Sequence, residues 1–180
     1  MTVSIGVLSD PFRWQLKSAE FVEIGVDTWL SADKVLASLP EGETRPIIAV
    51  GTASHENARE HPQVETARAE VRADKLVSIC ENKYPTADLY SINLGYFRPS
   101  ASIGTALSSS ERRLILLVIE EWEESADFGA GVFEALKQAS IDQRFSFDAR
   151  NYSNFMEGRF RLTERRKGKK RLVSTPGSRT

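Results

Sequence analysis

A single cysteine, Cys80, occurs in this chain of 180 residues, which also contains only two histidines and two methionines. One cysteine cannot form an intramolecular disulfide, so nothing in the sequence indicates an oxidising compartment. No hydrophobic run approaches the length of a membrane-spanning helix, and the first residues lack the basic and then apolar pattern of an export signal. We therefore expect a cytoplasmic protein with no membrane span.

Large apolar residues are scarce near the C-terminus, where basic residues accumulate. Residues 163–180 contain seven basic side chains and one acid, a formal charge of +6, which leaves −7 for the preceding residues because the whole chain carries −1. This composition predicts a disordered tail from about Arg166 onward. Phosphates could bind these residues, but no aromatic residue is interleaved to stack on a base. An acidic surface of a partner protein, or the acidic body of this protein itself, is an equal candidate. The candidate contact residues are Arg165, Arg166, Lys167, Lys169, Lys170 and Arg171.

A hydrophobic content of 41% in a chain of this length allows one core rather than two. Alternation and apolar runs predict strands over residues 2–9, 47–50, 87–97, 114–119 and 144–149. Helical spacing predicts helices over residues 17–39, with a kink, and over residues 62–80 and 126–140. The order predicts an α/β (α+β) two-layer sandwich, in which helices cover one face of a mixed sheet.

The same order divides the chain into three parts. Residues 1–120 are predicted to form the α/β domain, residues 121–162 a helix and strand extension packed on it, and residues 163–180 the basic tail. The segment 101–110, rich in small polar residues, is predicted to be a loop.

The turn after the second predicted strand is the candidate ligand site. Gly51 closes an apolar run there, and the following segment, TASHE, supplies hydroxyls, an imidazole and a carboxylate. The next helix carries two arginines, whose guanidinium groups suit a carboxylate ligand. The hypothetical ligand-binding residues are Thr52, Ser54, His55, His61, Arg68 and Arg72.

Four motifs in this order resemble the OmpA/MotB-type C-terminal domain, a family that binds peptidoglycan in the periplasm. They are VLSDPFRWQLKSAE, AVGTAS, ETARAEVRADKL and SSSERRLILLVI, which together cover roughly residues 1–120. In that family, an aspartate after the second strand and the arginine of an arginine-alanine pair hold the diaminopimelate of the stem peptide. The resemblance places the arginine at Arg68.

This sequence departs from the family pattern around that arginine. The resemblance places Ser54 at the aspartate position and His61 at the position of a family asparagine, and the glycine-rich turn after the third strand is shortened to GYFRP. A serine cannot supply the fixed negative charge that an ammonium group requires. The resemblance therefore implies a repurposed or inactive binding site.

Simpler explanations exist for most of these residues. Arg68 has the spacing of a helix ion pair with Glu65, and adjacent Ser54 and His55 lack the G-x-S-x-G context of a nucleophile. His55, His61 and Cys80 match no metal-ligand spacing. We therefore expect no catalytic site, no metal and no cofactor. Arg112 and Arg113 are predicted to cap the sheet and to pair with nearby acids.

These observations predict a non-catalytic, cytoplasmic interaction or scaffold module with an OmpA-like fold, as a component of a multiprotein assembly. Residues 121–162, with the third predicted helix, would form the surface for another protein or for self-association. The alternative is a domain that binds a peptidoglycan fragment or another small carboxylate through Arg68. A hydrolase with an unrecognised site ranks last.

Overall fold

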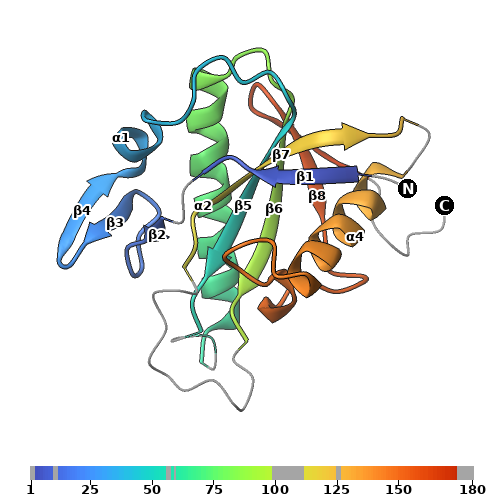
Figure 1. Cartoon of the computed structure of the whole chain (residues 1–180). Coiled ribbons are helices and arrows are strands. Elements are labelled where there is room, and N and C mark those ends of the chain that lie inside the picture. Colours follow the sequence, from blue (N-terminus) through green and yellow to red (C-terminus); the bar gives the residue numbers. More distant parts are fainter. Residues whose placement is uncertain are drawn as a thin grey trace.

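The computed structural model describes residues 3–9, 12–55, 58, 60–98, 112–124 and 127–173. The strands of the main sheet are β1 (Val3–Val7), β5 (Ile47–Ala53), β6 (Leu89–Tyr96), β7 (Ile115–Trp122), β8 (Leu162–Arg166) and β9 (Lys169–Leu172). They lie in the order β1-β7-β5-β6-β8-β9 in one six-stranded sheet (Figure 1). Only β5 and β6 pair in parallel; the other neighbours pair antiparallel. The predicted mixed α/β class is confirmed.

Helices cover both faces of the main sheet, so the prediction of helices on one face is wrong. Ile47 and Ala49 of β5 face α2 (Pro62–Lys83) in one hydrophobic core. Ile48 and Val50 share the second core with α4 (Phe128–Ile141). Every residue of β5 is buried, and a strand buried on both faces requires cover on both. Figure 1 shows α2 and α4 on opposite sides of the sheet.

The extension is an integral part of this fold. The apolar stripe predicted for residues 126–140, with Val132, Phe133 and Leu136, is buried against β1 and the central strands. This stripe is therefore part of the hydrophobic core, and it does not form the exposed interaction surface that was expected of the third predicted helix. Residues 144–149 are not a strand; they lead into the 3-10 helix η2 (Ala149–Asn151). The loop predicted over residues 101–110 lies outside the described residues.

The helix predicted over residues 17–39 is wrong for most of its length. That region contains β3 (Phe21–Gly25), β4 (Thr28–Ser31) and the short helix α1 (Ala32–Leu36), and β2 (Arg13–Trp14) pairs with β3. We call the three strands β2, β3 and β4 the small sheet; it lies beside the main sheet in Figure 1. Aromatic and β-branched residues favour strands here, and Asp27, with a φ of 51°, makes the turn.

The predicted disorder of the basic tail is wrong for residues 163–172, which belong to the β8–β9 hairpin. Strand β8 pairs with β6, and Leu162 is buried in the core. The turn at Lys167 and Gly168 has φ values of 38° and 78°, the left-handed backbone of a two-residue hairpin turn. Pairing with a preformed sheet offsets the ordering entropy that composition alone could not offset. Residues 174–180 lie outside the described part of the chain.

Cys80 offers a test of this packing. It is buried on α2, and burial raises the pKa of its thiol to about 12. We expect labelling of the native protein by a thiol reagent to be slower than labelling of the unfolded chain by roughly a thousandfold or more, because access requires unfolding. Labelling followed in native buffer and in denaturant measures the ratio. Equal rates in the two conditions would contradict the buried position of Cys80.

Candidate functional site

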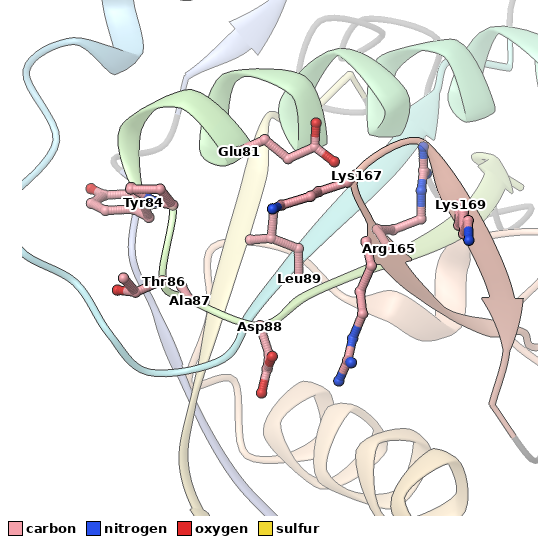
Figure 2. Close-up of a pocket in the computed structure, with 11 residues that line it drawn as sticks. Glu81, Tyr84, Thr86, Ala87, Asp88, Leu89, Arg165, Lys167 and Lys169 are labelled. Atoms are coloured by element: carbon pink, nitrogen blue, oxygen red, sulfur yellow. The ribbon is translucent and has the colours of Figure 1, made fainter.

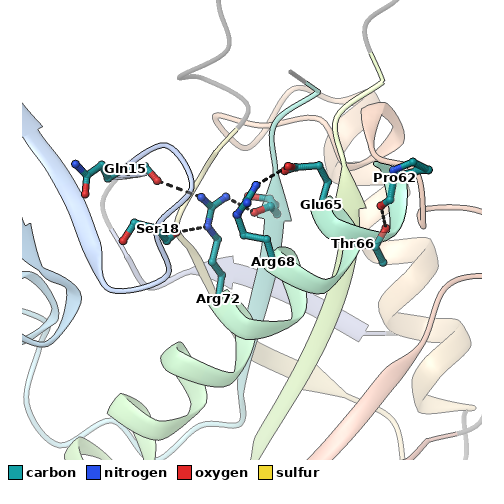
Figure 3. Close-up of polar contacts among 8 residues, drawn as sticks. Gln15, Ser18, Pro62, Glu65, Thr66, Arg68 and Arg72 are labelled. Carbon is teal, nitrogen blue, oxygen red and sulfur yellow. Dashed lines mark hydrogen bonds and ion pairs between the residues drawn. The ribbon is translucent and has the colours of Figure 1, made fainter. Parts of the chain in front are cut away.

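Arg72 is wholly buried, and its guanidinium group forms hydrogen bonds to backbone carbonyls of other segments (Figure 3). Its guanidinium donates from Nε to the Ser18 carbonyl at 2.8 Å, from Nη1 to the Thr52 carbonyl at 2.8 Å and from Nη2 to the Gln15 carbonyl at 3.2 Å. Burial, and then the nearby positive charge of Arg68, lowers the pKa of Arg72 to about 9. The side chain thus joins α2 to the end of β5 and to the segment before β3, and it is not open to a ligand.

Arg68 lies one helical turn before Arg72 and forms the ion pair that its spacing predicted. Its Nη1 donates to the carboxylate of Glu65, and the Glu65 side chain is buried (Figure 3). The pair, made through Oε1 of Glu65, offsets part of the cost of burying this carboxylate. One donor group that a ligand carboxylate would use is therefore already engaged within the helix.

The other polar residues predicted to bind a ligand are buried within the protein or lie away from Arg68 and Arg72. Thr52 is buried, and its hydroxyl donates to the Arg113 carbonyl at 2.8 Å. Ser54 is buried as well, and the His55 ring lies 6.5 Å from the ring of Phe97. His61 is exposed at the start of α2 and makes no side-chain capping bond. The structure thus brings Thr52 and Arg72 into contact through the Thr52 backbone carbonyl.

Arg112 makes the second buried link to the small sheet. Its Nε donates to the Trp14 carbonyl at 3.0 Å, and its Nη2 lies 3.2 Å from the Glu23 carboxylate. The predicted pairing of this arginine with a nearby acid is confirmed. Arg72 and Arg112 together hold the small sheet against the main sheet, so its surface is presented in a defined orientation.

The small sheet exposes apolar side chains that the sequence analysis assigned to a helix. Val26 at the hairpin tip is 93% exposed, and Trp29 on β4 is 44% exposed. The other large apolar residues that are exposed on β3 and β4 are Phe21, Ile24 and Leu30. A turn-forming Gly25-Val26-Asp27 between segments rich in aromatic and β-branched residues was the signal that could have predicted this hairpin.

A groove of about 580 Å³ lies between the C-terminal end of α2 and the β8–β9 hairpin (Figure 2). Its acidic lining residues are Glu81 and Asp88, and its basic ones are Arg165, Arg166, Lys167 and Lys169. The hydroxyl of Tyr84 donates to the Pro40 carbonyl at 2.6 Å, and burial raises the pKa of that phenol to about 12. The lining therefore has mixed charge, and its phenol is not free to act as an acid or base near neutral pH.

Within the described ranges, no group of three histidine, cysteine, aspartate or glutamate residues is placed to hold a metal ion. None of the helices described is long and apolar enough to cross a membrane. Comparisons of the chain with protein-family models, with curated proteins and with solved structures found no match.

Proposed function

We propose that this chain is a non-catalytic interaction module that self-associates through its small sheet. The observation that carries the proposal is the exposed apolar surface of β3 and β4, which is held rigidly by two buried arginines. An OmpA-like fold is part of the proposal. It is supported by the strand, helix, strand, helix, strand, strand order of β1, α1, β5, α2, β6 and β7, with the small sheet inserted after β1.

The outward face of the small sheet has the composition of a protein interface. Trp29 lies opposite Glu23 and Phe21 lies opposite Ser31, so the two aromatic side chains are diagonal neighbours on one face. Aromatic residues are enriched in interface cores, where each can bury on the order of 150–250 Å². Val26 extends this apolar surface to the hairpin tip.

A second copy of the chain is the partner that fits the β4 edge of the small sheet best. Strand β4 lies at the edge of the small sheet and is exposed along most of its length, so its outer backbone groups are open to another strand. Two identical β4 edges can pair antiparallel about a two-fold axis, and each copy then satisfies the other. The pairing joins two three-stranded sheets into one. Because β4 is short, we expect a reversible dimer with an area at the low end of the usual range.

The other expected functions have less support. Arg68 is paired with Glu65, and Arg72 donates to backbone carbonyls, so no contact favours the peptidoglycan or small-carboxylate alternative. Burial of Ser54 and internal bonding of Thr52 give no support to a hydrolase. Cytoplasmic placement stays a prediction from the sequence.

The variant Trp29→Thr tests the proposal, because it removes the aromatic contact and keeps a residue suited to a strand. We expect the wild-type protein to show a mass that rises toward that of a dimer with concentration in sedimentation equilibrium. Trp29→Thr should weaken association about tenfold or more, as for an aromatic anchor at the centre of an interface.

The matched control is Trp122→Thr, since Trp122 is 42% exposed on β7 of the main sheet. This variant should associate like the wild type, and the native protection of Cys80 checks that both variants are folded. A wild-type protein that stays monomeric at every concentration would overturn the proposal. Equal weakening by the two substitutions would overturn it as well.

A further inference from the structure

The β8–β9 hairpin separates its basic side chains onto two faces. Arg165 and Lys170 lie opposite each other in the strand register, so they share a face. Both form ion pairs with Asp74 of α2, at 2.8 Å and 3.2 Å, and Lys170 also lies 3.4 Å from Glu70. The face toward α2 is therefore neutralised by acids of the helix.

The opposite face keeps most of its positive charge. The register places Glu164 opposite Arg171 and Arg166 opposite Lys169, and these four line a hollow of about 200 Å³. Arg166 lies 2.7 Å from the Glu164 carboxylate, whereas the side chains of Lys169 and Arg171 make no hydrogen bond or ion pair within the described ranges. With Lys167 at the turn, four cations and one acid give this face a net charge of +3. We call these five residues the outer basic face.

The outer basic face is held by the main sheet rather than carried on a flexible tail. Strand β8 pairs with β6 along four residue pairs, and the buried Leu162 anchors its start. Strand β9 is exposed along its whole length at the edge of the sheet. Because the hairpin backbone is ordered before any ligand arrives, binding carries no cost for ordering that backbone.

We propose that the outer basic face binds the phosphate backbone of duplex DNA without sequence preference. All five of its side chains are charged, whereas the cores of protein interfaces are poor in lysine and rich in aromatic residues. The face has no aromatic group on which an unpaired base could stack, which disfavours single strands. Lysine and arginine bind phosphates by releasing counterions, which needs no contact with the bases.

Basic residues on an edge strand also have a role that needs no ligand. Lysines there prevent the edge from pairing with other chains. That role makes no distinction between Lys169 and Lys170, which are neighbours on β9. DNA binding does distinguish them, because Lys169 lies on the outer basic face and Lys170 is engaged by α2.

Fluorescence anisotropy of a labelled random-sequence DNA duplex, titrated with the full chain over a series of salt concentrations, tests the proposal. With three phosphates contacted, we expect the logarithm of the association constant to fall with the logarithm of salt with a slope of about −2.7. The double variant Lys169→Gln, Arg171→Gln should reduce the slope to about −0.9 and weaken binding at low salt about tenfold or more.

The control is Lys170→Gln, which removes one positive charge from the same strand on the neutralised face, where the double variant removes two from the outer basic face. It should change the affinity by less than about twofold, because the Lys170 ammonium is held against Asp74 and Glu70 on the face toward α2 and makes no phosphate contact. Native protection of Cys80 confirms that each variant is folded. Absence of duplex binding at low salt would overturn the proposal. It would also be overturned by equal losses in Lys170→Gln and the double variant, or by equally tight binding of polyglutamate, the probe for an acidic protein surface.

Discussion

Arg72→Met is expected to lower the free energy of unfolding by about 3 kcal/mol. The substitution leaves the carbonyl groups of Ser18, Thr52 and Gln15 without their donor, and each unsatisfied buried acceptor costs roughly 1–3 kcal/mol. The substitution also removes the cost of burying a charged guanidinium, and this offsets part of the loss of stability. The ring of Trp14, which lies 5.7 Å from the guanidinium carbon, also loses its cation contact. Denaturant unfolding followed by fluorescence or circular dichroism measures the loss.

Two further substitutions on α2 make the Arg72 result specific. Arg72→Lys keeps the charge, but a single ammonium group cannot reproduce the planar fork that reaches the carbonyls, so we expect an intermediate loss. Val71→Ala, at a position 52% exposed, should change stability by no more than about 0.5 kcal/mol. An Arg72→Met variant as stable as Val71→Ala would refute the cross-linking role of Arg72.

Gly51→Ala is the second substitution with a large expected effect, also a loss of about 3 kcal/mol. A Cβ atom at this position of β5 would collide with the carbonyl oxygen of Ala69 and lie 3.0 Å from the Cβ of Ala73. The obstacle is the backbone of α2, so the helix must move away from the sheet and lose packing along its length. Differential scanning calorimetry and denaturant unfolding measure the loss.

The control for Gly51→Ala is Gly25→Ala, which also places a methyl group on a strand glycine. At Gly25 the nearest atoms would be those of Thr28, at 3.9 Å, an ordinary van der Waals distance. We expect Gly25→Ala to change stability by no more than about 0.5 kcal/mol. Equal stabilities of the two variants would show that α2 does not require the close approach at Gly51.

The two large effects concern the same junction of the molecule. Gly51 lets α2 approach β5, and that approach places Arg72 within reach of the Thr52 carbonyl. Arg72 then reaches across to the segment that precedes β3. Since the small sheet is the proposed self-association surface, both substitutions are also expected to weaken dimer formation, through loss of its orientation.

Local patterns in the sequence determined the elements whose stability depends on their own residues. Strands β5 and β7 begin with continuous apolar runs, and β6 mixes apolar residues with polar ones. Helix α2 begins at Pro62 and contains several alanines, so these four elements were predicted close to their observed bounds. The Arg68–Glu65 ion pair was predictable for the same reason, because residues three apart on a helix are neighbours.

The errors arose where distant residues decide the local structure. Apolar residues of the segment 21–31 fitted both helical and strand spacing, and pairing with β2 together with the Arg112–Glu23 contact favours the hairpin. The basic hairpin was predicted to be disordered because composition counts its charges without the acids that face it. Asp74 and Glu70, far away in the sequence, neutralise one of its faces, and β6 supplies the edge for its pairing.

The sequence by itself determined which segments are strongly apolar or helical, that only one cysteine exists, and that positive charge gathers near the C-terminus. Only the tertiary structure decided what Gly51 and Arg72 do and which faces of the two hairpins are open. Periodicity and composition report interactions between near neighbours in the chain. Collision with a helix backbone, donation to three carbonyl groups and neutralisation across a sheet all depend on atoms that only the fold brings together.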